Sequence, residues 1–278
     1  MTTRALLPLV FFALAGCDPN RTIPERNAYV PQTVAPLECV PNLDGRIEAT
    51  ELRTAFGVPV RYLVNPAGTR RPVDLAGVTD SAGRRVWQLS TDYADDQVAT
   101  LTASTLEGKW YRASFPDGQF VAALDLAGSI EGVYSNDGST LFLLGYASAQ
   151  ENPMVGKTLV VYTSPIATFR FPLEAGQQWV SASEVRNATV RGLPYAGRDT
   201  YQQRVDATGT LELPDVAFTQ ALRVRTTLSI EPAVGVPLIR RQVGFVFECF
   251  GEVARAVSVD NEMADDFTQT SELRRLGF

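Results

Sequence analysis

The chain has 278 residues, 45% of them hydrophobic and 20% charged, which is an ordinary composition for a globular protein. Its formal net charge of −6 gives it no bulk attraction for nucleic acid, so we expect no nucleic-acid partner. The sequence has no histidine, which excludes Ser-His-Asp and Cys-His catalysis and histidine-ligated zinc sites.

Residues 1–16 have the layout of a secretory signal peptide. Arg4 supplies a positive charge, and the uncharged apolar run "ALLPLVFFALA" follows it at residues 5–15. This run is too short to cross a bilayer, which takes about 20 apolar residues. The alternative is a buried helix of the mature fold, which Pro8 inside the run disfavours.

The four residues Leu14-Ala15-Gly16-Cys17 resemble the bacterial lipobox. The resemblance implies cleavage before Cys17, transfer of a diacylglyceryl group to its thiol, and acylation of the new amino group by a fatty acid such as palmitate. Two or more acyl chains hold a protein stably on a membrane. We therefore expect a lipid-anchored protein that faces the periplasm or the cell exterior. The alternative is an ordinary signal peptide that happens to end near a cysteine.

The rest of the chain divides into a tether and a folded region. Residues 17–38 begin with the lipidated cysteine and continue as a polar stretch with four prolines and no hydrophobic periodicity, which is typical of a flexible tether. We interpret residues 39–278 as a β-rich domain. A soft subdivision falls near residues 148–156, and one continuous domain or two smaller ones both fit the pattern.

A candidate calcium site follows the tether, in "PNLDGRIEATEL" at residues 41–52. Asn42, Asp44 and Glu51 have the spacing of the later part of an EF-hand loop, with Glu51 at the position of the bidentate ligand. Val40 stands where the first ligand of such a loop belongs. The alternative is an Asp-Gly turn that leads into a short helix.

Several stretches have the pattern of β-strands. The stretch "ALRVRTTLSI" at residues 221–230 alternates strictly, which predicts a strand with one wet face that carries Arg223 and Arg225. The stretch "STLFLLGYA" at residues 139–147 is apolar on both faces, so we expect it to lie centrally and to be covered on both sides. Turn residues at Asn136-Asp137-Gly138 and at Thr208-Gly209 predict hairpins.

Helical patterns are scarce. The stretch "EATELRTAF" at residues 48–56, closed by Gly57, is one candidate, and residues 270–278 with Ser271 as N-cap are another. Many strands and few helices predict a mainly β fold. We expect an antiparallel β-sandwich or a partly open β-barrel with one or two short helices.

A succession of motifs in the second half of the chain resembles a family of uncharacterised lipoproteins of myxobacteria and related bacteria. The resemblance implies an extracytoplasmic address and brings no mechanism with it. The motifs that carry it are "FRFPL", "GQQW", "LPYAGRDTY", "GTLELPDVAF", "ALRVRT" and "FECFGEVAR".

The densest acidic set is Asp92, Asp95 and Asp96 in "TDYADDQ". Carboxylate-dependent hydrolysis needs two such groups roughly 5–10 Å apart in a cleft. The alternative is a solvated loop between strands. We therefore assign no catalytic residue from the sequence.

Three functions remain open. The first is a non-enzymatic structural or binding module that is held at the membrane and meets an unknown protein or apolar ligand. The second is a carrier of a lipid or another apolar ligand in a half-barrel, which requires a concave cavity of several hundred Å³. The third is a carboxylate-dependent hydrolase.

Cys39 and Cys249 are the cysteines that remain when Cys17 is acylated. Export places them in an oxidising compartment, where thiols within reach pair. With two cysteines, one intramolecular pairing exists, so we predict a Cys39–Cys249 disulfide. The alternative is a pair of buried thiols too far apart to react.

Overall fold

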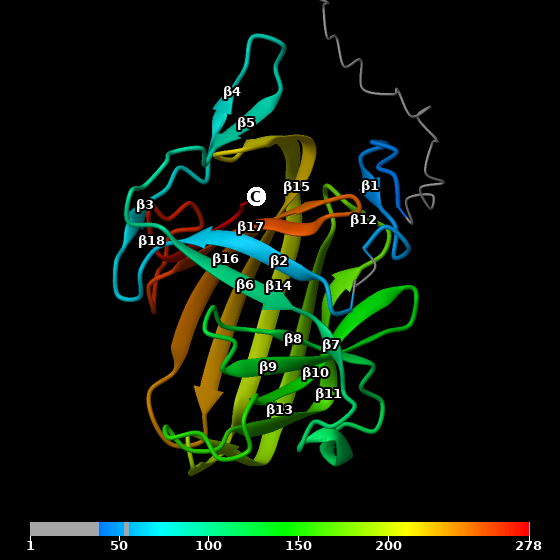
Figure 1. Ribbon diagram of the computed structural model, residues 1–278, viewed down its shortest axis with the longest axis vertical. Coiled ribbons are helices and arrows are strands. Elements are labelled where there is room, and N and C mark those ends of the chain that lie inside the picture. Colours follow the sequence, from blue (N-terminus) through cyan, green and yellow to red (C-terminus); the bar gives the residue numbers. More distant parts are fainter. Residues whose placement is uncertain (1–38, 53–55, 278) are drawn as a thin grey trace, which may run out of the picture. The chain divides into compact units, whose positions relative to one another are not determined.

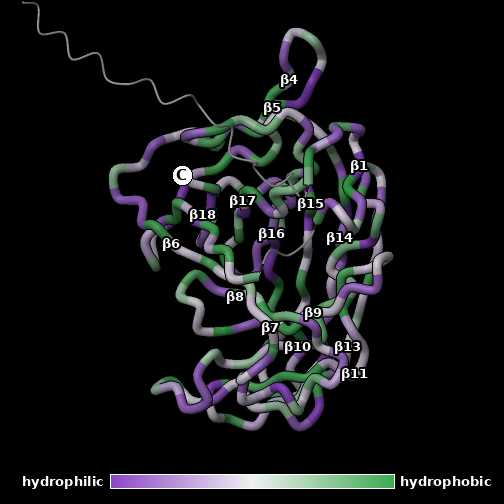
Figure 2. The backbone as a smooth tube through the Cα atoms, turned by 45° about the vertical axis from the view of Figure 1, so that its right-hand side comes forward, coloured by the Kyte–Doolittle hydropathy of each residue, from purple (hydrophilic) through white to green (hydrophobic). Residues whose placement is uncertain are grey.

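Long β-strands dominate the computed structural model, which describes residues 39–52 and 56–277. Hydrophobic and hydrophilic residues alternate along these strands (Figure 2), because successive side chains of a strand point to opposite faces of its sheet. The described elements are β1 (Arg46–Ile47), β2 (Pro59–Val64), β3 (Arg71–Pro72), β4 (Val78–Thr79), β5 (Arg85–Gln88), β6 (Gln97–Thr102), β7 (Ser104–Thr105), the 3-10 turn η1 (Arg112–Ser114), β8 (Phe120–Ala123), β9 (Ile130–Asn136), β10 (Thr140–Ser148), β11 (Leu159–Arg170), β12 (Leu173–Glu174), β13 (Gln178–Val190), β14 (Leu193–Glu212), β15 (Ala217–Pro232), β16 (Leu238–Phe247), β17 (Gly251–Ser258) and β18 (Gln269–Leu276).

Sixteen of these strands form one curved sheet that is almost entirely antiparallel. Its main order is β6-β2-β18-β17-β16-β15-β14-β13-β11-β10-β9-β8-β7, and β5 joins β14 in parallel. The two ends of this order, β6 and β7, are consecutive in the chain and are linked through Ala103. The sheet therefore closes on itself into a nearly complete barrel. In Figure 1 the long strands β13–β16 run down one wall, and the shorter strands β2 and β6 cross in front of them above β8–β11.

The mainly β, barrel-like fold predicted from the sequence is confirmed. The stretch at 139–147 forms most of β10, and its side chains enter one apolar core on each face of the sheet, with Leu143 on one side and Ala147 on the other. The turn at Asn136-Asp137-Gly138 joins β9 to β10, and its side-chain oxygens accept the backbone N–H groups of the turn, as in Asx turns.

Both helix predictions are wrong for the residues that the structure describes. Residues 269–276 form strand β18, because pairing with β17 and β2 buries Leu273 and Leu276 in the core. Residues 48–52 form turns, not a helix. The helical element of the described chain is the three-residue turn η1.

The hairpin expected at Thr208-Gly209 is also wrong, since both residues lie inside the 20-residue strand β14. Gly209 serves a different purpose there. A Cβ atom at this position would lie 2.4 Å from the carbonyl oxygen of Arg85, so glycine allows β5 to approach β14 closely.

The outer face of β15 was predicted to be solvent-exposed because it carries two arginines. This prediction is wrong. Arg223 and Arg225 are buried, and both bind the carboxylate of Asp206. The segment from residue 73 to residue 89 covers this side of the sheet with an apolar core. Trp87 lies at its centre, fully buried, with its ring centroid 5.0 Å from that of Phe245.

The N-terminal segment of the described chain is fastened to the barrel by its disulfide. The predicted Cys39–Cys249 bridge is confirmed, with the two Cα atoms 5.6 Å apart. The carboxylate of Glu248 accepts the backbone N–H groups of Asn42 and Leu43. Strand β1 pairs with β12 and inserts Ile47, which is 1% exposed, into an inner apolar core.

Residues 149–158, near the suggested subdivision, connect two neighbouring strands of the same sheet. Strands β10 and β11 pair directly on either side of this loop. The described residues form one compact unit. No helix within residues 39–52 and 56–277 is long and apolar enough to span a membrane.

Candidate functional site

A cavity of about 740 Å³ lies inside the barrel. Its walls come from β9, β10, β11, β14, β15, β16 and β17, and it is bordered by the loop at residues 153–156. Cavities of a few hundred to about 1,000 Å³ are typical of small-molecule binding sites. The size and concavity that a carrier of an apolar ligand requires are therefore present.

Strand register explains which side chains line the cavity. On β15 the inward row is Val224, Thr226, Leu228 and Ile230, the apolar face of the alternating stretch described above. A polar row on the neighbouring strand β14 lies beside it. In this row Asp199 pairs with Ile230, Tyr201 with Leu228 and Gln203 with Thr226. The cavity therefore has an apolar wall directly beside a polar wall.

The polar wall is centred on Asp199, which is only 2% exposed. The hydroxyl of Tyr162 donates to its Oδ2 at 2.8 Å. The hydroxyl of Tyr201 lies 3.2 Å from that of Tyr162, and it is the donor of this pair because the single proton of Tyr162 is used on Asp199. Tyr146 packs edge-on against Tyr162, with ring centroids 6.2 Å apart.

Burial governs the ionisation of this cluster. Burial raises the pKa of Asp199, and the hydrogen bond from Tyr162 offsets only part of that effect. Burial also raises the pKa values of Tyr146, Tyr162 and Tyr201, and the nearby charge of Asp199 raises each of them further. The tyrosines therefore stay neutral at all physiological pH values.

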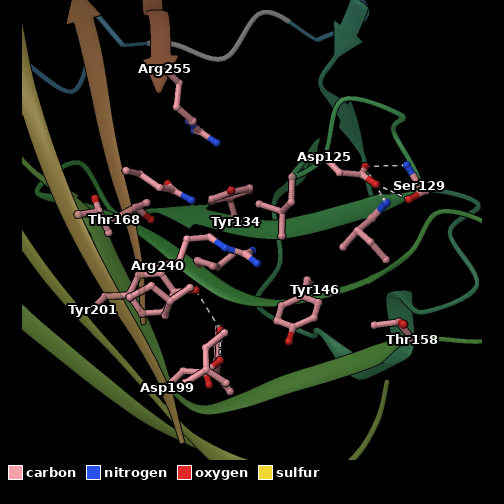
Figure 3. Close-up of a pocket in the computed structure, with 18 of the residues that line it drawn as sticks. Asp125, Ser129, Tyr134, Tyr146, Thr158, Thr168, Asp199, Tyr201, Arg240 and Arg255 are labelled. Carbon is pink, nitrogen blue, oxygen red and sulfur yellow. Dashed lines mark hydrogen bonds between the residues drawn. The ribbon is translucent and has the colours of Figure 1, made fainter. Parts of the chain in front are cut away.

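A second charged group on the cavity wall is fully paired. The guanidinium of Arg255 binds the carboxylate of Glu252 through two hydrogen bonds, one of them 2.6 Å long. Gly244 makes room for this pair, since a Cβ atom there would lie 2.7 Å from Glu252 Oε1. Figure 3 shows Arg255 pointing towards Tyr134 across the cavity. Burial raises the pKa of Tyr134 to about 12.

Three polar atoms on the cavity wall are buried without a hydrogen-bond partner among the described residues. They are Asp199 Oδ1, Gln203 Oε1 and Thr168 Oγ1. Buried polar groups in folded proteins are nearly always paired, because an unpaired one costs roughly 1–3 kcal/mol. Unpaired groups that line a cavity of this size are the expected partners of a ligand.

The residues of the candidate calcium site lie close together and bind one another. The Glu51 carboxylate accepts the side-chain amide of Asn42 at 2.9 Å and the backbone N–H of Glu48 at 2.8 Å. The side-chain oxygens of Asn42 and Asp44 accept the backbone N–H groups of Asp44 and Arg46. A calcium ion would have to replace these bonds. No cluster of three or more acidic, cysteine or histidine residues suited to a metal occurs in the described part of the chain.

The acidic set at residues 92–96 lies away from the cavity and binds arginines. Asp95 and Asp96 both bind Arg71, and Asp96 also binds Arg275, which is 1% exposed. Tyr93 covers Arg71, with the guanidinium 4.3 Å from its ring centroid. These contacts attach the loop to β3 and β18.

The cavity residues of β14 gave no signal in the sequence. Inward positions of a strand are recognised by apolar residues, and here they are Asp199, Tyr201 and Gln203. The regular alternation of β15, which pairs with them, was the available clue. The signal peptide at 1–16, Cys17 and the rest of the tether at 17–38 lie outside the described residues.

Fold and site together define the class, a nearly closed antiparallel barrel with a mixed polar and apolar internal cavity. Comparisons of the chain with protein-family models, with curated proteins and with solved structures found no match in any of the three.

Proposed function

We propose that this protein is an exported lipoprotein, anchored to a membrane through acyl chains on Cys17, whose barrel binds a small ligand with an apolar body. The lipobox-like motif after an apolar run supports the anchor. The disulfide supports export, because disulfides persist in oxidising compartments. The protein would hold its ligand at the periplasmic or outer face of the cell without transforming it.

The observation that carries the binding function is the cavity itself. A barrel that only supports other structures would fill its interior with side chains, as protein cores normally do. Here an interior of about 740 Å³ is open, its wall of Val224, Leu228 and Ile230 is apolar, and the neighbouring strand β14 carries polar atoms that have no hydrogen-bond partner among the described residues. The arrangement suits a molecule with an apolar body and a polar group.

Binding is tested with the apolar fluorescent probe N-phenyl-1-naphthylamine. We expect saturable fluorescence enhancement with the wild-type protein and loss of it in Leu228→Trp, whose side chain fills the cavity. Ser229→Trp is the matched control, because residue 229 lies on the opposite face of the same strand. Equal enhancement in both variants would place the probe elsewhere and refute the cavity as the binding site.

The anchor is tested by labelling cells with a radioactive fatty acid. Cys17→Ser should abolish labelling and leave unprocessed precursor. A variant that is still cleaved normally and still partitions into detergent would contradict the anchor.

A further inference from the structure

Asp199 is a buried carboxylate with no cationic partner among the described residues and only one hydrogen-bond donor. Glu248 is also buried without an arginine, but it accepts two backbone N–H groups. Asp96 binds two arginines, Asp206 binds two others, and Glu252 binds Arg255. The only hydrogen-bond donor that reaches Asp199 from the described residues is the hydroxyl of Tyr162. Its second oxygen, Oδ1, is buried with no partner among them.

An ionised carboxylate in this position lowers the free energy of unfolding. Removing a charge from water without a counter-ion costs far more than the modest gain from one neutral hydrogen bond. The sheet could have relieved this cost with an arginine, as it does around Asp206 on the same strand. The missing counter-charge is therefore the notable feature of the cavity wall.

The surroundings of Asp199 are aromatic. Tyr162 and Tyr201 meet nearly at right angles, with ring centroids 6.5 Å apart, and Tyr146 adds a third ring beside Tyr162. Ring faces attract cations, and organic ammonium groups are commonly held by several aromatic side chains together with a carboxylate. Figure 3 shows Tyr146, Tyr201 and Asp199 grouped at one side of the cavity.

The remaining charges that line the cavity do not serve as the counter-ion. Arg240 binds Asp260 at 2.8 Å, and Arg255 is held by Glu252. Arg191 is exposed on the turn between β13 and β14. Two carboxylates of the wall, Asp125 and Asp199, lack an ion-pair partner among the described residues. Asp125 accepts the backbone N–H groups of Ser129 and Ile130 and the hydroxyl of Ser129, whereas Asp199 accepts a single hydrogen bond, so a positive group on a ligand would meet the greater unmet need at Asp199.

We propose that the ligand of the cavity is an amphiphilic organic cation, whose ammonium group binds Asp199 between Tyr146, Tyr162 and Tyr201 and whose apolar body lies against β15. This inference deepens the proposed binding function and rests on it. An ammonium N–H donates to Oδ1 of Asp199 and neutralises the buried charge. The ring faces contact the carbon atoms next to the ammonium. Leu228 and Ile230 contact the apolar chain.

The test compares three probes that share a ten-carbon chain: decylamine, decanol and decanoate, all below their critical micelle concentrations. At pH 7 the amine is almost entirely protonated. Affinities are measured by displacement of N-phenyl-1-naphthylamine from the wild-type protein. We expect decylammonium to bind roughly 30-fold or more tightly than decanol, as for a desolvated charge pair, and decanoate to bind most weakly.

Asp199→Asn should reduce the affinity for decylammonium to that for decanol and leave decanol unchanged. Asp215→Asn is the matched control, because it removes the same charge from an exposed turn. Equal affinities of the amine and the alcohol for the wild type would overturn the inference and leave the binding function standing. Preference for decanoate would also overturn it. If no decyl compound displaces the probe and the probe itself does not bind, the binding function fails as well.

Discussion

The Cys39–Cys249 disulfide should stabilise the fold mainly through the unfolded chain. It closes a loop of 210 residues, for which the loss of chain entropy in the unfolded state corresponds to roughly 5 kcal/mol. This value is an upper one, because compact unfolded chains have less entropy to lose. The native structure should persist without the bridge, since Glu248 still binds the backbone of Asn42 and Leu43 and Ile47 stays buried.

The variant to measure is Cys39→Ser with Cys249→Ser, which avoids a lone reactive thiol. Urea unfolding should show a free energy of unfolding lower by about 3–5 kcal/mol. The m-value should rise, because the unfolded chain expands without its cross-link. Reduction of the wild-type protein should reproduce both changes, and the double variant should not respond to the reductant. A loss below about 1 kcal/mol with an unchanged m-value would show that the bridge does not act through loop closure.

Three further predictions concern single side chains. Because burial raises the pKa of Asp199, the folded state holds its proton more tightly than the unfolded state, so stability falls as pH rises from the unfolded value of about 3.9 through the folded one. Asp199→Asn should therefore raise the melting temperature at pH 7, with a gain that shrinks on acidification; a constant gain would contradict this. Millimolar calcium should raise the melting temperature of the wild type and not that of Glu51→Gln, and equal or absent shifts would leave the segment at 42–51 without a metal. Gly209→Ala should cost about 1–3 kcal/mol, because its Cβ would lie 2.4 Å from the carbonyl oxygen of Arg85, and an unchanged melt would refute this reasoning.

The sequence predicted features that depend on local pattern. The alternation at residues 221–230 predicted the central part of strand β15. It also predicted the apolar face of this strand, which lines the cavity. The Asn136-Asp137-Gly138 turn was predicted because its side chains bind their own backbone, whatever surrounds them. Counting cysteines was enough to predict the disulfide.

Features that depend on distant partners could not be predicted in this way. The tail at 270–276 has leucines three residues apart and a serine that could cap a helix, yet pairing with β17 decides its conformation. Arg223 and Arg225 resemble a solvated face, but Arg223 binds the backbone of Leu75 and Arg225 binds Asp265 and Asp266. In each case tertiary contacts override the local preference.

The two aspartates of β14 show why the cavity could not be predicted from the sequence. Asp199 and Asp206 are seven residues apart on one strand, and both are partly or fully buried. Asp206 faces outward. Burial acts to raise its pKa, but Arg223 and Arg225 together lower it. Asp199 faces inward to tyrosines, and its pKa is raised.

Which face each aspartate occupies is set by strand register, which the sequence of β14 alone does not specify. From Asp199 to Val205 the odd-numbered residues point into the barrel. A β-bulge between Val205 and Ala207 then reverses the order, so that Ala207 and Leu211 join the outer core. The bulge ends the polar inward row and places Asp206 on the outer face, where it binds the arginines of β15. Asp199 is left as a buried carboxylate without a cationic partner among the described residues, which costs stability and which the proposed cationic ligand would relieve.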